Sequence, residues 1–195
     1  VGFFIGGGLF LNGKLYRGHN GYAGEIGHIS TVSEGTGELC FCGNPGCWET
    51  TINQRAVIRR VEACLKNGSS SLIPNLMLEK NESSLSVELI KQAADAGDEA
   101  ALGSFVEVGR AMGQGIAGIV NIFNPEKVVI GGTLSAASGH LLPAMKAAIA
   151  QRALNDVLKK TDVIPSVFGD DASLFGAVAI VVEDIMWNPS SIERR

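Results

Sequence analysis

Residues 40–49 read CFCGNPGCWE and place three of the chain's four cysteines within eight positions, followed shortly by Glu49. Three thiols this close together predict a metal site, because structural zinc takes four cysteine or histidine ligands in a tetrahedron. Two other interpretations stay open. One is a redox relay, although thioredoxin-like pairs have the spacing C-x-x-C within a strand-to-helix unit, and that context is absent. The other is a turn of free cysteines.

A fourth ligand is needed to complete a zinc site. His28 closes the stretch GEIGH at 24–28, twelve residues before the first cysteine of the cluster, in the same loop region. The rival is Cys64, which falls on the apolar side of a predicted helix, where a lone cysteine is usually a small core residue. Gly43 and Gly46 suit a backbone that wraps round a metal, because glycine tolerates positive φ. The predicted zinc ligands are His28, Cys40, Cys42 and Cys47.

The composition excludes several classes of function. The chain has 195 residues, 46% of them hydrophobic, which is enough for a sizeable core. A net charge of -4 leaves no basic stripe for phosphates, so this chain by itself is a poor nucleic-acid binder. We find no signal peptide and no apolar run near 18 residues, and the clustered cysteines do not resemble a disulfide framework. A cytoplasmic protein that does not enter a membrane is expected.

The pattern along the chain predicts an α/β architecture. Asn12-Gly13 between two β-rich runs predicts a type I′ hairpin, and the long polar, glycine-rich stretch at 19–49 predicts a functional loop. The apolar run KVVI at 127–130 is typical of a strand buried on both faces. Helices are predicted over 50–67, 85–96, 99–123, 141–158 and a closing 172–186, strands over 127–130 and 162–168, and a surface connection over 68–84. The order βαβα favours an α/β fold.

Glycines interrupt the helix predicted over 99–123, at positions 103, 109, 113 and 115. Each glycine costs a helix up to about 1 kcal/mol relative to alanine. We therefore expect another helix or backbone to approach this helix closely. Asn124-Pro125 is expected to end it.

The stretch GEIGH followed by CFCGNPGCWE resembles the signature of the ROK family, E-x-G-H followed by C-x-C-G-x-x-G-C-x-E. Weaker motifs of that family also have counterparts over most of the chain. They are N-G-x-L-Y-x-G at 12–18, N-P-E at 124–126 with Gly131-Gly132 after the next strand, and A-x-L-x-G-A at 172–177.

The resemblance implies an actin-like (ribonuclease H-like) fold of two lobes, with a sugar bound between them. Residues 1–187 would form the C-terminal lobe, 188–195 a tail, and the N-terminal lobe would be absent from this chain. By the same resemblance, His28 would hold zinc through one ring nitrogen and touch the sugar with the other. Glu25 and Glu49 would accept hydrogen bonds from sugar hydroxyls; without a sugar, each would be a solvated carboxylate or a charge at a helix N-terminus.

Two departures from the family bear on catalysis. In kinases of the family the opening loop has a motif similar to G-T-G-x-G. Residues 2–8 of this chain read GFFIGGG. Phe3 and Phe4 thus stand where the kinases have a hydroxyl group and a bare backbone that face phosphate. An alternative register lets Gly6 to Gly8 cradle the phosphate. The family's catalytic aspartate and its D-x-G-G-T loop belong to the upstream lobe, and Asp170-Asp171 fits a helix N-cap better than a base.

The sequence therefore predicts the sugar-sensing C-terminal domain of a ROK transcriptional regulator, which binds a sugar or sugar phosphate beside a structural zinc. We expect a homodimer, because dimers are the common case for such proteins. The chain opens inside a strand, which suggests a missing partner upstream, and DNA would be reached only through an upstream domain. The alternative is an ATP-dependent sugar kinase of the glucokinase, fructokinase or N-acetylhexosamine kinase type. In that case the nucleotide would be bound by Gly6, Gly7, Gly131 and Gly132. A third hypothesis is a zinc-stabilised scaffold without ligand.

Overall fold

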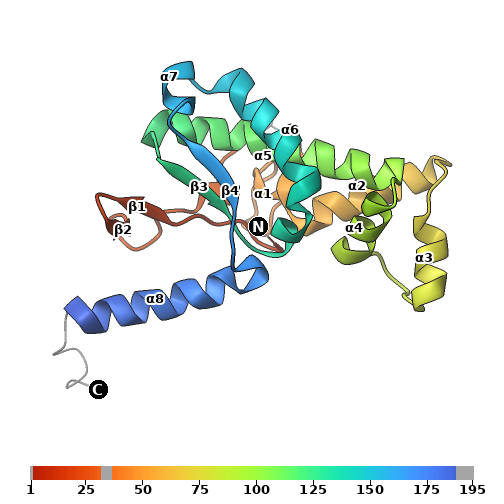
Figure 1. Cartoon of the computed structure of the whole chain (residues 1–195), viewed down its shortest axis with the longest axis horizontal. Coiled ribbons are helices and arrows are strands. Elements are labelled where there is room, and N and C mark those ends of the chain that lie inside the picture. Colours follow the sequence, from red (N-terminus) through yellow and green to blue (C-terminus); the bar gives the residue numbers. More distant parts are fainter. Residues whose placement is uncertain (1, 32–36, 188–195) are drawn as a thin grey trace.

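The computed structural model describes residues 2–31 and 37–187, so the predicted tail at 188–195 lies outside the described residues. Figure 1 shows a long central helix flanked by others, with the strands toward one end of the molecule and α3 at the other. The elements are β1 (Leu9–Leu11), β2 (Lys14–Tyr16), the 3-10 turn η1 (Ile26–His28), α1 (Glu49–Ile52), α2 (Gln54–Lys66), α3 (Ile73–Lys80), α4 (Val87–Asp95), α5 (Glu99–Phe123), β3 (Lys127–Ile130), η2 (Thr133–Ala137), α6 (Ser138–Arg152), α7 (Asn155–Leu158), β4 (Asp162–Pro165), η3 (Gly169–Asp171) and α8 (Ala172–Trp187).

The core forms around α5, whose apolar stripe is buried along most of its length. Helix α6 packs along α5 at very short range. A Cβ atom on Gly109 would lie 2.5 Å from the carbonyl oxygen of Leu141, and one on Gly113 would lie 2.3 Å from that of Met145. The predicted close approach of another helix is thus confirmed at these two positions. Gly103 has nothing within 4 Å of such an atom and lacks this explanation.

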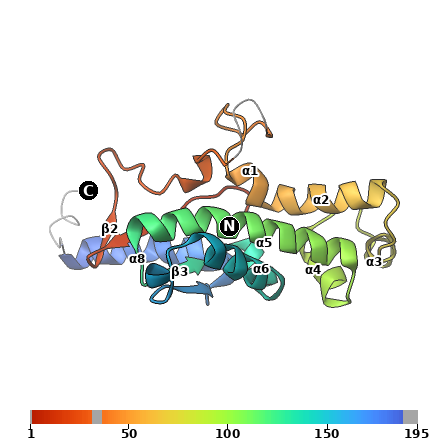
Figure 2. The ribbon, with the colours of Figure 1, turned by 90° about the horizontal axis from the view of Figure 1, so that it is seen from above.

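Helix α2 packs on another part of α5, and Figure 2 shows the two helices running side by side. The predicted helix over 50–67 is in fact two helices, because Asn53 takes an extended backbone (φ -82°, ψ 176°) between them. The Asn53 side chain then accepts the N–H of Ala56 at 2.9 Å and caps α2. Helix α1 is thereby left as a separate turn directly after the cysteine stretch.

The two small sheets have the predicted strand pairing, but the burial of β3 differs from the prediction. Strands β1 and β2 pair antiparallel, and Asn12 and Gly13 have φ of 53° and 75°, as the predicted hairpin requires. Strands β3 and β4 pair parallel, with Val129 opposite Ile164. Contrary to expectation, β3 is not buried on both faces, since Val129 is 57% exposed; Ile164, opposite it on β4, is 39% exposed. Val128 and Val163 face the core instead.

Three other boundaries also differ from the prediction. The connection at 68–84 contains α3, because Pro74 is tolerated in the first turn of a helix and Leu76 packs against the core. The helix predicted over 141–158 breaks into α6 and α7, since the N–H of Leu154 donates to Asn121 Oδ1 at 2.9 Å on α5. The strand expected to reach residue 168 ends at Pro165.

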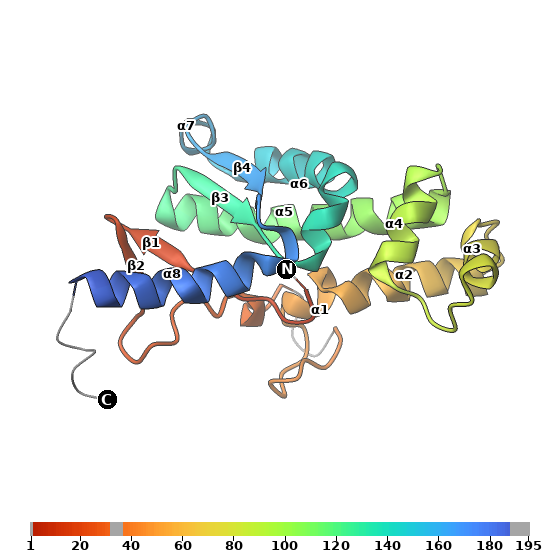
Figure 3. The ribbon, with the colours of Figure 1, turned by 60° about the horizontal axis from the view of Figure 1, so that its bottom comes forward.

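The last helix forms as predicted but does not close on the lobe. Figures 1 and 3 show α8 running away from α5 and α6, joined to the remainder at its first turn. Its apolar side chains are largely exposed. No helix within residues 2–31 and 37–187 combines the length and apolar character that a membrane crossing requires.

Asp98 joins the start of α5 to the start of α3. Its Oδ1 accepts the N–H of Ala101 at 2.9 Å, and its Oδ2 accepts that of Leu72 at 2.6 Å. Burial would raise the pKa of Asp98, but these backbone donors hold it below its usual range.

Replacing Asp98 by Ala should lower the free energy of unfolding by about 1–3 kcal/mol at neutral pH, because two buried N–H groups lose their acceptor. Asp98→Asn, which keeps one acceptor, should cost less. A lowered folded-state pKa adds stability above the unfolded pKa of about 3.9, and this stability is lost as pH falls through the folded pKa. Urea unfolding should therefore show the deficit of Asp98→Ala shrinking in acid. An equal loss of unfolding free energy in Asp98→Ala at neutral and at acidic pH would contradict this role of the carboxylate.

Candidate metal centre

The loop between η1 and α1 brings together four side chains that could hold a metal ion. His28, Cys40, Cys42 and Cys47 each offer one ligand atom, and these atoms all lie within 4.8 Å of one another. The Sγ atom of Cys40 lies 3.7 Å from His28 Nδ1, and the Sγ atoms of Cys42 and Cys47 lie 3.5 Å apart. Cys64 is half-buried on α2 and does not belong to the cluster.

The donor set and its spacing fit zinc. In a tetrahedral site with Zn–S bonds of about 2.3 Å, two thiolates lie about 3.7 Å apart. The separation of 3.5 Å between the Sγ atoms of Cys42 and Cys47 is close to that value. Three thiols with one imidazole form one of the usual ligand sets of structural zinc.

The protonation of the thiols depends on their surroundings. The backbone N–H of Asn44 lowers the pKa of Cys42 to about 7. Burial raises the pKa of Cys47 to about 12 and also raises that of Cys40. The two buried thiols therefore stay protonated unless a cation is present, and binding of a divalent metal would release protons.

The backbone of the cysteine stretch forms a tight knuckle. Gly43 and Gly46 have φ of 92° and 76°, as predicted for a chain that wraps round a metal. The N–H of Gly43 donates to the carbonyl of Cys40, and the N–H of Cys40 donates to the carbonyl of Asn44, both at 2.9 Å. The knuckle is thus shaped by its own backbone hydrogen bonds.

Trp48 anchors the knuckle to the core. It is only 3% exposed, and its Nε1 donates to the carbonyl of Ala111 on α5 at 2.9 Å. A Cβ atom on Gly115 would lie 2.3 Å from the indole ring, so the glycine makes room for the tryptophan. The close approach predicted at Gly115 is therefore to this side chain.

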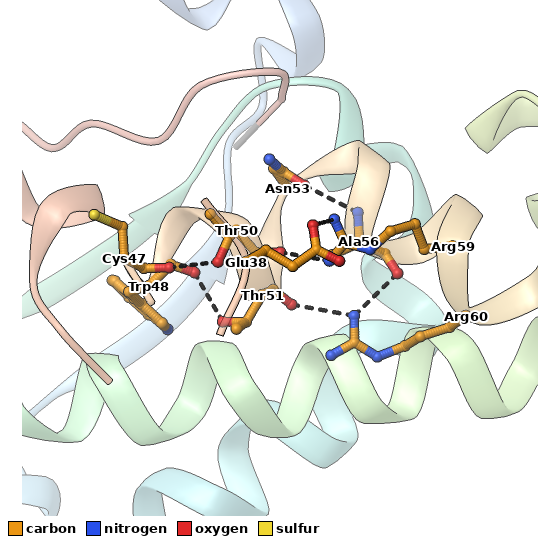
Figure 4. A network of polar contacts seen from close by, with 9 residues as sticks. All are labelled: Glu38, Cys47, Trp48, Thr50, Thr51, Asn53, Ala56, Arg59 and Arg60. Carbon is orange, nitrogen blue, oxygen red and sulfur yellow. Dashed lines mark hydrogen bonds and ion pairs between the residues drawn. The ribbon is translucent and has the colours of Figure 1, made fainter. Parts of the chain in front are cut away.

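A network of polar contacts holds the segment behind the knuckle (Figure 4). The hydroxyls of Thr50 and Thr51 donate to the carbonyls of Cys47 and Trp48, each at 2.8 Å. Arg59 on α2 donates to the carbonyl of Thr50 at 2.8 Å and pairs with Glu38. These bonds fix the orientation of α1 and α2 relative to the cysteines.

Glu49 joins the knuckle to the opening loop of the chain. It is 4% exposed; its Oε2 accepts the N–H of Ile5 at 2.7 Å, and its Oε1 accepts from Cys40 Sγ at 3.5 Å. A solvated carboxylate, one of the predicted alternatives, is therefore wrong for this residue. The link to Ile5 spans 44 positions, and no local sequence pattern indicates it.

Glu25 lies on the outer side of the cluster and is exposed. Its Oε2 lies 3.6 Å from His28 Nε2. The two ring nitrogens of His28 thus face different partners, Nδ1 the thiols and Nε2 the carboxylate. A carboxylate beside the outer nitrogen is the usual way in which proteins orient a metal-binding histidine.

A pocket of about 280 Å³ opens beside the knuckle. Glu49 lines it, whereas Glu25 and His28 do not belong to its lining. Sequence reasoning missed most of its walls, because exposed aromatic and basic residues carry no spacing signal. The Arg55 guanidinium lies 4.7 Å from the centroid of the Phe3 ring, within range of a cation–π contact. The residues that line it include Phe3, Phe4, Phe41, Glu49, Arg55 and Arg59.

The glycines considered for a nucleotide lie in two loops that come close together. A Cβ atom on Gly2 would lie 3.7 Å from the hydroxyl of Thr133, which directly follows Gly132. The N–H of Gly7 donates to the carbonyl of Gly24 at 2.7 Å, and that of Gly132 donates to the carbonyl of Gly169 at 3.0 Å. The amides of Gly7 and Gly132 are therefore already bonded within the protein.

Comparison with known proteins gives consistent matches. A model of the ROK family matches residues 1–184. The DNA-binding transcriptional dual regulator NagC of Escherichia coli (strain K12) is 39% identical over 176 residues, which cover 90% of this chain and 41% of NagC. Among solved structures, a ROK family transcriptional regulator homologous to the E. coli MLC protein is 32% identical with a TM-score of 0.75, and the match covers 85% of this chain and 40% of that one.

A second solved structure is a ROK family glucokinase from Streptomyces griseus in complex with glucose and AMPPNP. It is 29% identical with a TM-score of 0.81, and the match covers 92% of this chain and 58% of the glucokinase. These likenesses confirm the predicted α/β fold, which such regulators and kinases share. The chain spans between 40% and 58% of the length of these three proteins.

Gly27 tests whether the loop that carries Glu25 and His28 is held by its contact with the opening loop. A Cβ atom on Gly27 would lie 2.3 Å from the carbonyl oxygen of Ile5. Gly27→Ala should therefore lower the free energy of unfolding by about 1–3 kcal/mol in a thermal or urea titration. Gly6→Ala is the matched control, because nothing lies within 4 Å of its Cβ position. Equal stability of the two variants would show that the loops do not support one another.

Proposed function

The chain belongs to the ROK family, and on that basis we propose that it is the C-terminal lobe of a transcriptional regulator that senses a sugar or sugar phosphate beside a structural zinc. NagC, its regulator relative, is more than twice as long as the match, which leaves room for an upstream lobe and a DNA-binding domain. The whole protein would act in the cytoplasm as a homodimer and would contact DNA only through that upstream domain.

The proposed zinc ligands are His28, Cys40, Cys42 and Cys47. Bound zinc would supply the positive charge that stabilises the thiolates and would fix the loop that ends in Trp48 and Glu49. Binding through Nδ1 of His28 leaves Nε2 as a hydrogen-bonding group on the side of Glu25. The metal in this proposal has a structural role and takes part in no reaction.

The proposed sugar contacts are Glu25, His28 and Glu49. Carboxylates accept hydrogen bonds from hydroxyls, and Nε2 of His28 adds a group that the zinc would orient. Glu25 is exposed, and beside the oxygen that faces His28 Nε2 it has a second carboxylate oxygen that can accept from a ligand. Glu49 Oε2 accepts from Ile5, whereas Oε1, which accepts from the Cys40 thiol here, would lose that donor once zinc converts Cys40 to a thiolate. The Glu49 carboxylate also lines the pocket. The upstream lobe would complete the sugar site.

The state of the opening loop is the observation that favours sensing over phosphoryl transfer. Phosphoryl transfer needs free backbone N–H groups around the phosphates. Here the N–H of Ile5 donates to Glu49 and that of Gly7 to Gly24. Phe3 and Phe4 directly precede Ile5, and the Phe4 ring centroid lies 6.1 Å from that of Phe41. A loop with bonded amides and apolar side chains is a poor cradle for phosphate.

An ATP-dependent sugar kinase is the second candidate function. The TM-score of 0.81 to a glucokinase in complex with glucose and AMPPNP favours it, as does the short distance between Gly2 and Thr133 of the two glycine loops. In that case Gly6, Gly7, Gly131 and Gly132 would face the nucleotide, and the catalytic base would lie in the upstream lobe. The amides of Gly7 and Gly132 would first have to leave their present acceptors.

Metal analysis of the full-length protein, purified without chelator, should find about one zinc per chain. His28→Ala and Cys47→Ala should lose most of it, because each removes one of four ligands. Cys64→Ala is the control that should keep it, since Cys64 lies outside the cluster. Absence of zinc in the wild-type protein, or its loss in Cys64→Ala, would contradict the assignment.

Calorimetry with a panel of hexoses, N-acetylhexosamines and their phosphates should find a ligand for the full-length protein. Glu25→Gln should weaken its binding roughly 10- to 100-fold, which corresponds to the loss of a hydrogen bond to a charged group. The zinc content of this variant should not change. A coupled assay for ATP consumption with the same sugars should show no turnover. Turnover would support the kinase, and absence of heat with every sugar would support a scaffold.

A further inference from the structure

Helix α2 carries three arginines, Arg55, Arg59 and Arg60, which differ in what they contact. Figure 4 shows the contacts of two of them. Arg59 pairs with Glu38, and Arg60 donates to two backbone carbonyls at 3.3 and 2.9 Å. Among the residues that the structure describes, 2–31 and 37–187, no carboxylate pairs with Arg55, which is exposed. Its positive charge is therefore available to a ligand.

Aromatic rings hold Arg55 at the pocket beside the knuckle. Its guanidinium lies 4.7 Å from the centroid of the Phe3 ring. The centroids of Phe3 and Phe4 lie 5.9 Å apart and those of Phe4 and Phe41 6.1 Å apart, both pairs edge to face. All three rings line the pocket together with Arg55. Charges beside apolar surface are screened less than charges in open water, so an anion in this pocket would be attracted more strongly to Arg55.

The pocket combines this cation with a carboxylate. Glu49 lines it as well, whereas the charges of Glu38 and Arg59 in its wall balance one another. A carboxylate accepts hydrogen bonds from hydroxyls, and the planar fork of an arginine matches a phosphate or a carboxylate. The volume of about 280 Å³ lies just below the range of pockets for drug-sized ligands, roughly 300–1,000 Å³. The pocket thus suits a ligand with one ring, several hydroxyls and an anionic group.

We propose that the ligand sensed beside the knuckle is an anionic monosaccharide, whose hydroxyls face Glu49 and whose phosphate or carboxylate group pairs with Arg55. This inference rests on the proposed function for the sugar and adds the charge of the ligand. The N–H groups of Ile5 and Gly7 are already bonded within the protein, so a side chain is left to meet the anion. Arg55 would then distinguish the anionic sugar from its neutral parent.

The alternative role of Arg55 is structural: it would only fasten the opening loop to α2 through Phe3. In that case its removal would weaken the binding of charged and neutral sugars alike. Two measurements separate these roles. They are the ratio of the affinities for an anionic sugar and its parent, and the dependence of binding on salt.

Calorimetry on the full-length protein with glucose, N-acetylglucosamine, their 1- and 6-phosphates and glucuronic acid tests the proposal. The wild-type protein should bind an anionic sugar more tightly than its parent. Arg55→Gln should lower this ratio of affinities roughly 10- to 100-fold, as expected for the loss of a hydrogen-bonded charge. Arg55→Lys should keep part of the ratio, because it keeps the charge and loses the fork.

Arg152→Gln on α6 is the matched control. It removes the same charge from another exposed arginine, which does not line the pocket, and should leave the ratio unchanged. Added salt should weaken the binding of the anionic sugar more in the wild-type protein than in Arg55→Gln, because salt screens the attraction. The series also tells the two anions apart, since tight binding of glucuronic acid would assign the site to sugar acids and tight binding of a phosphate to sugar phosphates.

An unchanged ratio in Arg55→Gln would overturn the proposal, as would an equal loss in Arg152→Gln. A wild-type protein that binds a neutral sugar at least as tightly as every anionic one would also overturn it, while the sensing of a sugar would stand. Absence of heat with every sugar, charged or neutral, would reject the sensing function itself.

Discussion

The contact between Trp48 and α5 connects the core of the lobe to its candidate metal centre. The indole fits against Gly115, where no side chain stands in its way, and donates to the carbonyl of Ala111. Cys47 directly precedes this tryptophan and Glu49 directly follows it. The position of α5, itself fixed by α6 at Gly109 and Gly113, therefore determines where the knuckle and its carboxylate lie.

From this anchor the site extends in two directions. Toward the start of the chain, Glu49 accepts the N–H of Ile5, and this bond takes an amide of the opening loop away from any ligand. Toward the outside, the cluster holds His28 so that its second ring nitrogen faces Glu25. In the proposed function, this one small region would make the opening loop a poor cradle for phosphate and would present polar groups to a sugar. This combination is what distinguishes the proposed sensor from a kinase of the same fold.

Features with local signals could be predicted from the sequence. The Asn12-Gly13 hairpin, the end of α5 at Asn124 and the clustering of four candidate ligands all follow from neighbouring residues or fixed spacings. Features set by distant contacts could not. The buried state of Glu49 depends on Ile5, and the break between α6 and α7 depends on Asn121. The exposure of β3 and α8 reflects surfaces that this chain does not cover by itself.

The coordination of zinc in the full-length protein is the most direct test of the proposed site. X-ray absorption at the zinc edge should show three sulfur atoms at about 2.3 Å and one nitrogen at about 2.0–2.1 Å. This shell should not change when the sugar binds, because the metal orients the loop and does not contact the ligand. A shell of four sulfur atoms would exclude His28 as a ligand. A shell that changes on addition of sugar would contradict a purely structural metal.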